Sequence, residues 1–321
     1  MSKNVPPISD PQRIRSWLRG PIVAAATPFK EDNSLDLNAL HKNIRFMIDG
    51  GVQTGDGALL VAAAAGEHPT LSVDERKAIM ELAVEAAQGQ VPVMASVQHT
   101  DCRVIEDLAN FAGETGIAAV QLAPTYYYRP TEDDVLRLFR RIAACSDVTL
   151  MIYHTWWNGV HFSIDLLRKL AEIETVRVLK WSSSNDAAFR NGILALRDDL
   201  VIIDNSSHHI LSHLLGCSGF ITHLSNFWPQ YPLALWRLLE KEEYAAANDH
   251  LATFKWEWGK WRDKVIKLTS GEGPFIKAAM EQLGLRAGPP RPPCVRPPEH
   301  LQLELQELLH RAGVPLAVGA T

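Results

Sequence analysis

The sequence predicts an α/β protein, a (β/α)8 TIM barrel followed by a helical extension at the C-terminus. Eight short apolar runs alternate with amphipathic helical patterns between residues 20 and 240. Each run is apolar throughout, as is typical of parallel strands that are buried on both faces. The alternative, a doubly wound open sheet, would carry a glycine-rich turn after its first strand. The sequence contains no GxGxxG motif, so the repeated strand–helix units favour the closed barrel.

The eight apolar runs are the expected strands. In chain order they cover residues 22–26, 58–62, 91–97, 118–123, 148–153, 176–180, 200–204 and 219–222. A helix is expected after each run, and two of these helices have clear start signals. Ser72 is followed three residues later by Glu75, which predicts a capping box. Thr131 is followed by acidic residues in the first helical turn, which favours a second helix start there.

Two further segments flank the barrel domain, which is expected to span residues 20–240. Residues 1–19 are predicted to form an N-terminal tail, frayed over its first ~15 residues. Residues 241–321 are predicted to form the helical extension, with helical patterns over 242–268, 273–283 and 298–312. A proline-rich stretch between the last two patterns can only be an extended connector.

The composition of the 321 residues argues against several classes of protein. Lys and Arg number 32 against 37 Asp and Glu, which gives a net charge of −5. Without a basic stripe, this charge argues against nucleic-acid binding. No apolar run reaches the ~18 to 20 residues of a membrane helix, and the N-terminal tail has no apolar core of a signal peptide. The four cysteines are far apart in the sequence, so we expect reduced thiols in a cytoplasmic protein.

Residues at the carboxyl ends of barrel strands surround the active-site mouth. Lys180 closes the sixth expected strand, where partial burial would lower its pKa and leave a neutral amine able to form a Schiff base with a carbonyl. The structural alternative is a strand-end lysine that pairs with a carboxylate such as Asp204 or Glu67. Tyr153 closes the fifth strand, where its phenol could relay protons or simply fill the barrel with its hydroxyl satisfied.

These two residues belong to a longer pattern that runs from about Gly20 to Gly313. Its pieces are Thr27-Pro28-Phe29, Gly66-Glu67, Leu71-Ser72, Glu75-Arg76, Pro124-Thr125-Tyr126-Tyr127, Pro130, Tyr153, Lys180, Ser183, residues 216–221, Asn226, Pro229, Gly273-Pro274 and Lys277-Ala278. In order and spacing, the pattern resembles the dihydrodipicolinate synthase and N-acetylneuraminate lyase family of pyruvate-type Schiff-base aldolases.

The resemblance implies roles for three tyrosine and lysine side chains. Lys180 would form the imine, Tyr153 would relay the proton, and Tyr127 would be inserted into the site of a neighbouring subunit. The resemblance also implies a homo-oligomer, a tetramer or a dimer, that acts on a small 2-oxo acid. It implies no metal and no organic cofactor, because the covalent imine on Lys180 supplies the electron sink.

The loop after the second strand departs from the family. Most members have Gly-Thr-Thr-Gly-Glu there, or Ser-Thr, whereas residues 63–67 are Ala-Ala-Ala-Gly-Glu. The backbone N–H groups of Ala64 and Ala65 could still hold a carboxylate as a small anion nest. The hydroxyls that usually link the two relay tyrosines are gone, so a relay would need water, His99 or His154. The glutamate is expected to order the loop rather than to do chemistry.

The segment after Tyr153 departs as well. The synthases place an arginine five residues on, where it holds the carboxylate of the aldehyde substrate, and Asn158 stands at that position here. Trp156 and Trp157 occupy a stretch that commonly carries proline and a small residue. After the seventh strand, the usual Gly-Asp pair is replaced by residues 204–206, Asp-Asn-Ser. These departures argue against dihydrodipicolinate synthase itself, and the two tryptophans fit a polyol pocket poorly.

Four of the nine tryptophans, Trp156, Trp157, Trp181 and Trp228, fall at or just after strand ends. Aromatic rings stack on flat substrates and bury apolar area, which favours an aromatic or apolar acceptor, although some of these rings could instead pack between loops or subunits. The expected substrate-binding residues are Ala64, Ala65, Trp156, Trp157, Asn158, Asn205, Thr222 and His223. His154 and His223 are candidates for hydrogen bonding or acid–base roles.

No metal site is expected. His208, His209, His213 and His223 lie near the last two strand ends, but nothing resembles an HExxH motif. The function predicted from the sequence is therefore a lyase of the aldolase type that acts on a 2-oxo acid. Two alternatives stay open, namely a Schiff-base dehydratase or deaminase of a 2-oxo or sugar acid, and a catalytically degenerate paralogue that binds a ligand.

Overall fold

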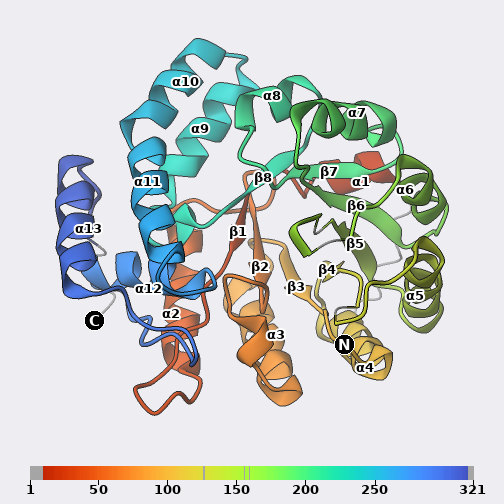
Figure 1. Ribbon diagram of the computed structural model, residues 1–321, viewed down its shortest axis with the longest axis horizontal. Coiled ribbons are helices and arrows are strands. Elements are labelled where there is room, and N and C mark those ends of the chain that lie inside the picture. The colour runs from red at the N-terminus through yellow and green to blue at the C-terminus, as the bar shows by residue number, and fades with distance from the viewer. Residues whose placement is uncertain (1–9, 126, 155, 159, 317–321) are drawn as a thin grey trace.

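The computed structural model describes residues 10–125, 127–154, 156–158 and 160–316. Eight parallel strands close into a barrel in the order β1 to β8, as Figure 1 shows. The strands are β1 Gly20–Ala24, β2 Ala58–Val61, β3 Val93–Ser96, β4 Ala119–Leu122, β5 Thr149–Tyr153, β6 Val176–Trp181, β7 Val201–Asp204 and β8 Gly219–Thr222. The predicted (β/α)8 fold class and all eight expected strands are confirmed.

The barrel closes where β1 pairs with β8, with Gly20 opposite Gly219. A Cβ atom on Gly219 would lie 2.1 Å from the carbonyl oxygen of Gly20. Since no real side chain tolerates that separation, a glycine at position 219 lets the first and last strands approach closely enough to pair.

Eight helices follow the strands and cover the outside of the barrel (Figure 1). They are α2 Leu37–Asp49, α3 Val73–Ala87, α4 Cys102–Thr115, α5 Glu132–Cys145, α6 Ile164–Ala171, α7 Asp186–Leu196, α8 His209–Leu214 and α9 Gln230–Glu240. Both predicted start signals are confirmed: Ser72 with Glu75, and Thr131 with Asp134, form reciprocal capping boxes. These boxes satisfy backbone N–H groups that the first helical turn leaves free.

A short helix, α1 Pro11–Arg15, precedes the barrel. The side chains of Ile14 and Leu18 are fully buried and belong to the same apolar cluster as Ile22, Met151 and Val178 inside the barrel. The expectation of fraying is therefore wrong for residues 10–15, the part of the first ~15 residues that the structure describes. The physical reason is that the apolar interior of the barrel must be shielded from water at its amino end. Ile14 and Leu18, four residues apart, cover it there.

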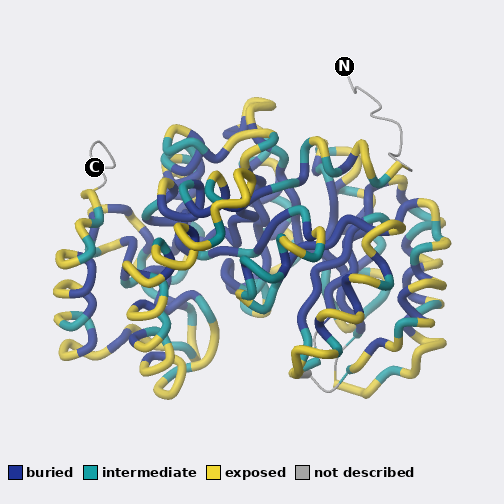
Figure 2. The backbone as a smooth tube through the Cα atoms, turned by 90° about the horizontal axis from the view of Figure 1, so that it is seen from above, coloured by how far each residue is buried: buried dark blue, intermediate teal, exposed yellow. Residues whose placement is uncertain are grey.

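Up to residue 316, where the described part of the chain ends, the C-terminal extension contains four helices: α10 Tyr244–Thr253, α11 Lys255–Ile266, α12 Gly273–Gln282 and α13 Glu299–Arg311. The pattern over 242–268 is two helices rather than one, because Phe254 leaves helical geometry with φ −144°. Buried rings of Trp258, Trp261 and Phe275 make a second apolar core. Figure 2 shows buried backbone running through both the barrel and this extension. No helix within the described residues is both long and apolar enough to cross a bilayer.

Candidate active site

Strand alternation decides which strand-end side chains face the barrel lumen. Met94, Ala119, Met151, Val178 and Ile203 fill the barrel interior together with Ile221. The residues two positions further on form the next layer, at the carboxyl end of the barrel: Ser96, Gln121, Tyr153, Lys180, Asn205 and His223. This layer therefore contains both side chains that were predicted to carry the chemistry.

Lys180 is 4% exposed, and its Nζ donates a hydrogen bond of 3.0 Å to Oε1 of Gln121. The same Nζ lies 4.0 Å from the ring centroid of Tyr153, which pairs with Lys180 across β5 and β6. Burial lowers the pKa of Lys180 to about 8, against the opposing charge of Glu272. A lysine in this state supplies neutral amine near neutral pH, which is what a Schiff-base nucleophile requires.

The suggested alternative partners of Lys180 lie elsewhere. Asp204 faces away from the lumen, where its Oδ1 accepts the N–H of Ser206 and its Oδ2 accepts the hydroxyl of Ser212. Glu67 lies 2.6 Å from Nζ of Lys277. Neither carboxylate contacts Lys180, so the structural interpretation of a strand-end ion pair is wrong for both.

Tyr153 is 7% exposed and sits against the imine candidate. Burial raises the pKa of its phenol, the charge of Glu272 raises it further, and a hydrogen bond with the side chain of Asn205 opposes both effects. The ring of Trp157 approaches edge-on, with centroids 5.8 Å apart. Trp157 is 46% exposed and contacts Trp156 in turn, so these two tryptophans stand at the open end of the barrel beside Tyr153.

Gln121, which accepts the hydrogen bond of Lys180, is held by a polar network that the sequence did not predict. Nε2 of Gln121 donates to Oε1 of Gln98 at 3.0 Å, and the hydroxyl of Ser96 donates to the same oxygen at 2.8 Å. This arrangement turns Oε1 of the fully buried Gln121 toward Lys180. The available signal was a glutamine inside an otherwise apolar strand, because a buried amide needs partners.

Two titratable groups near the mouth were also not predicted. Glu272, the residue before α12, lies with Oε2 3.1 Å from Nε2 of His223. Burial would raise the pKa of Glu272, but His223 and Lys180 lower it on balance to about 2. His68, in the short 3-10 segment His68–Thr70, has its pKa lowered to about 4 by burial and by the charges of Arg76 and Lys180. Neither residue lies at a strand end, where the barrel pattern places functional side chains.

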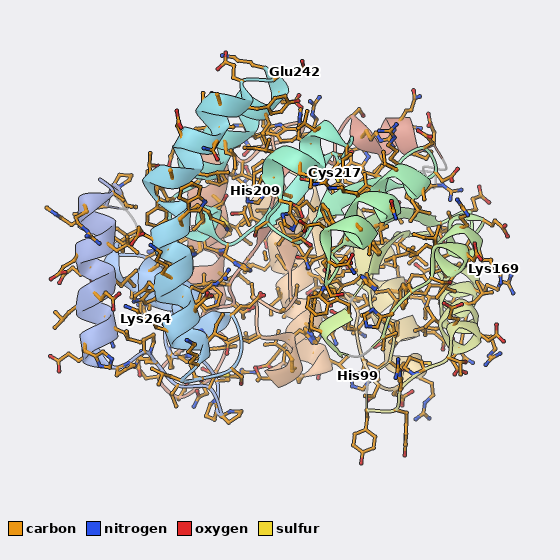
Figure 3. The ribbon with its side chains drawn as sticks, turned by 45° about the horizontal axis from the view of Figure 1, so that its top comes forward. His99, Lys169, His209, Cys217, Glu242 and Lys264 are labelled. Atoms are coloured by element: carbon orange, nitrogen blue, oxygen red, sulfur yellow. The ribbon has the colours of Figure 1, made fainter. Side chains whose placement is uncertain are left out.

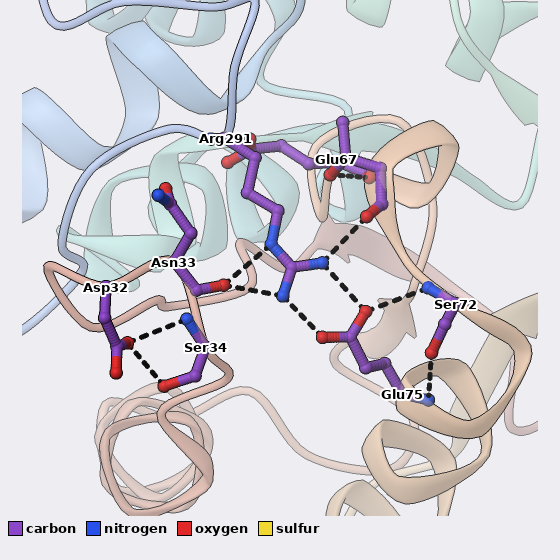
Figure 4. A network of polar contacts seen from close by, with 8 residues as sticks. Asp32, Asn33, Ser34, Glu67, Ser72, Glu75 and Arg291 are labelled. Atoms are coloured by element: carbon purple, nitrogen blue, oxygen red, sulfur yellow. Dashed lines mark hydrogen bonds and ion pairs between the residues drawn. The ribbon is translucent and has the colours of Figure 1, made fainter.

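The loop after β2 is held by a polar network around Arg291, shown in Figure 4. Oε2 of Glu67 accepts the backbone N–H of Arg291 at 2.8 Å, and the Arg291 guanidinium donates to the carboxylate of Glu75 and the carbonyls of Asn33 and Thr70. Within this loop Ala65 is buried and Ala64 is half-buried. Their N–H groups have no acceptor among the described residues, so a carboxylate nest there stays a prediction.

Other expected mouth residues face outward. Nε1 of Trp181 donates to the carbonyl of Phe189 on α7 at 3.0 Å. Oγ1 of Thr222 accepts the N–H of Leu224, and its strand partner is Val23 of the outer core. Trp228 packs on Tyr231 and Phe254, and Nδ1 of His154 lies 2.7 Å from the carbonyl of Ser182. The structure thus places Trp181, Thr222, Trp228 and His154 outside the lumen.

Tyr127 protrudes from the loop after β4. Its side chain is 89% exposed, its φ of 85° lies in the left-handed region, and its ring contacts Tyr128 at a centroid separation of 5.1 Å. Its insertion into a second subunit stays a prediction. Tyr126 lies outside the described residues, as does the side chain of Asn158.

The histidines do not gather into one centre. Among the described residues no group of three His, Cys, Asp or Glu side chains could hold a metal ion. His209 lies 3.5 Å from Asp204, whereas His213 contacts Tyr244. His99, on the loop after β3, lies far from His209 in Figure 3, and its Nδ1 accepts the N–H of Asp101.

Comparison with known proteins decides the family. Residues 17–312 match the dihydrodipicolinate synthetase family. The chain belongs to this family. It is 29% identical over 301 residues to an uncharacterized DapA-like lyase of Thermococcus onnurineus, covering 91% of this chain and 98% of that one. Membership of the dihydrodipicolinate synthetase family places the chain among DapA-like lyases of the class I aldolase type.

Solved structures of relatives have the same fold. Dihydrodipicolinate synthase from Aquifex aeolicus superposes with a TM-score of 0.83 at 27% identity, over 93% of this chain and 99% of that one. A prophage protein of E. coli K12 from the dihydrodipicolinic acid synthase family, in complex with pyruvate, gives a TM-score of 0.83 at 23% identity over 92% and 99%. The second likeness concerns the fold alone.

The lowered pKa of Lys180 in this dihydrodipicolinate synthetase family member predicts a pH dependence. An imine at Lys180 would need the neutral amine, whose fraction grows as pH rises toward the pKa of about 8. The rate at low pyruvate should therefore increase by about tenfold per pH unit below that value and flatten above it. Stopped-flow or quench trapping between pH 6 and 10 measures this profile. A rate that still climbs tenfold per unit at pH 9.5 would show that Lys180 is not desolvated.

Proposed function

We propose that the chain is a Schiff-base lyase that breaks or forms the carbon–carbon bond between a pyruvate-type 2-oxo acid and its acceptor. The observation that carries this proposal is the burial of Lys180 at the carboxyl end of the barrel. Its Nζ contacts the ring of Tyr153 and the side-chain amide of Gln121. A lysine that serves only structure is ordinarily paired with a carboxylate, and Lys180 instead contacts neutral groups.

The mechanism follows from these neighbours. The neutral amine of Lys180 attacks the ketone of the 2-oxo acid, and loss of water gives a protonated imine that accepts the electron pair of the breaking bond. The N–H groups of Ala64 and Ala65 hold the substrate carboxylate. Tyr153, oriented by Asn205, moves the proton between the enamine carbon and solvent or substrate oxygen.

The acceptor end of the substrate is aromatic or apolar. Trp156 and Trp157 support this because their rings contact each other beside Tyr153, and Trp157 keeps 46% of its surface exposed. Exposed aromatic rings around a polar centre favour stacking of a flat group. Trp181 and Trp228 give no support, since they pack outside the lumen.

Borohydride trapping tests the proposal directly. The protein is incubated with saturating pyruvate, reduced, digested and examined by mass spectrometry. We expect a stable adduct on the peptide that contains Lys180. A protein left unmodified under these conditions would contradict the proposal and favour the degenerate ligand-binding paralogue. Product analysis with the unreduced protein then separates the lyase from a dehydratase or deaminase, because only the lyase yields a new carbon fragment.

A further inference from the structure

A histidine–glutamate pair joins the barrel to the C-terminal extension at the rim of the mouth. His223 follows β8, and Glu272 precedes α12. Their side chains meet through Nε2 and Oε2 at 3.1 Å and keep 18% and 37% of their surfaces exposed. The imidazole packs edge-on against Phe275, with centroids 5.6 Å apart. The ring is therefore oriented, and its Nδ1 has no partner among the described residues.

The pair lies among the groups proposed to carry the chemistry. His223 stands two residues beyond Ile221 of the barrel interior, in the same lumen layer as Lys180 and Tyr153, and Glu272 contacts it from the C-terminal extension. The first turn of α12 also abuts the β2 loop, since a Cβ on Gly273 would lie 2.4 Å from Oε1 of Glu67. The pair and the β2 loop therefore line the same mouth of the barrel as Lys180.

The chain contains a second histidine–glutamate pair, which lies away from the barrel mouth. Nε2 of His213 lies 3.5 Å from Oε1 of Glu240, and the side-chain exposures are 16% and 35%. Glu240 ends α9 and also pairs with Arg19, the residue before β1. It therefore sits at the amino end of the barrel strands. The two pairs match in chemistry and exposure but lie at opposite ends of the barrel.

We propose that His223 is the acid–base residue for the oxygen of the acceptor, with Glu272 as its positioning residue. This inference rests on the proposed function. In cleavage, the hydroxyl proton of the carbon that will leave passes to the free Nδ1 of His223. The O–H electron pair becomes the new C=O bond, the carbon–carbon bond breaks, and its electrons neutralise the iminium as an enamine. Condensation runs the same steps in reverse, with the proton returned to the oxygen.

The pair also defines a substrate class. The partly exposed carboxylate of Glu272 accepts a hydrogen bond from a hydroxyl and repels a second carboxylate placed there. The substrate is accordingly a 2-oxo acid with a hydroxyl on the carbon beyond its enamine carbon, and its acceptor half is uncharged. This assignment separates the roles in the site, because Tyr153 serves the enamine carbon and His223 serves the acceptor oxygen.

Three measurements on His223→Asn and Glu272→Gln test the assignment. They are borohydride-trapped imine with pyruvate, deuterium exchange into the pyruvate methyl group, and condensation of pyruvate with benzaldehyde. Imine and exchange need Lys180 and Tyr153 but no acceptor, so we expect both within about threefold of the wild type. Condensation should fall about 10²-fold or more, as for loss of a general acid–base group. Glu272→Asp should recover part of this loss, and the matched control Glu240→Gln should leave all three rates unchanged.

The outcomes are separable. Equal loss of exchange and condensation in His223→Asn and Glu272→Gln would make the pair structural and overturn the inference, as would condensation at the wild-type rate. Absence of imine in the wild-type protein would instead overturn the proposed function on which the inference rests. Circular dichroism of each variant shows whether the fold is kept, and Glu272→Asp serves if Glu272→Gln does not fold.

Discussion

Replacement of Lys180 by alanine or arginine should abolish the trapped imine and lower turnover by roughly five to six orders of magnitude, as removal of a covalent nucleophile does in other enzymes. Alanine lacks the amine, and arginine is never neutral near physiological pH. The measurement combines steady-state rates with mass spectrometry of the borohydride-reduced protein. Arginine keeps a cation above the ring of Tyr153. Loss of activity in Lys180→Arg would therefore show that the reaction needs the nucleophilic amine and not only a positive charge.

Two other lysines provide matched controls. Burial lowers the pKa of Lys255 and Lys277 to about 8 as well. Neither faces the lumen: Lys255 begins α11, and Lys277 pairs with Glu67. Lys255→Ala should keep the imine and most of the activity. Trapping on Lys255 in the Lys180→Ala protein, with retained turnover, would show that the nucleophile was assigned to the wrong residue.

The fold and the two central residues could be predicted because their signals are local. Buried parallel strands give continuous apolar runs, and Lys180 and Tyr153 stand out as polar residues that end such runs. The direction in which side chains at the strand ends point, into the lumen or outward, could not be predicted. A shift of one residue exchanges the inner and outer faces. This is why Trp181 and Thr222 were placed at the mouth, although Lys180 and His223, their immediate neighbours, occupy the lumen layer.

The remaining parts of the site depend on contacts between distant segments. Glu272 reaches His223 from an extension that follows the barrel, and Gln98 reaches Gln121 from the preceding loop. No periodicity along the chain encodes either contact. The glutamine in the fourth strand was a usable signal, because a buried amide requires partners. By contrast, an acidic residue at a helix start, such as Glu272, is ordinarily explained by the helix dipole.

Lys277→Met is expected to destabilise the protein by about 3 to 5 kcal/mol, the usual cost of leaving one partner of a buried ion pair unpaired. Lys277 and Glu67 have side-chain exposures of 2% and 5%, and their charged atoms lie 2.6 Å apart. Nζ of Lys277 also donates to the carbonyl of Pro289 at 2.9 Å. Denaturant unfolding followed by tryptophan fluorescence measures the change. Lys264→Met, which breaks an exposed pair with Glu304, should cost no more than about 1 kcal/mol.

The double variant Glu67→Gln with Lys277→Met should be more stable than Lys277→Met alone. Burial lowers the pKa of Lys277 even though Glu67 opposes the shift, so the pair does not fully offset the desolvation of its own charges. Removal of both charges removes that cost, and the introduced amide keeps an oxygen for the backbone N–H of Arg291. A double variant as unstable as Lys277→Met would show that the network stabilises the fold through its charges. Because Glu67 closes the β2 loop, Lys277→Met should also raise the KM for pyruvate while imine still forms at saturation.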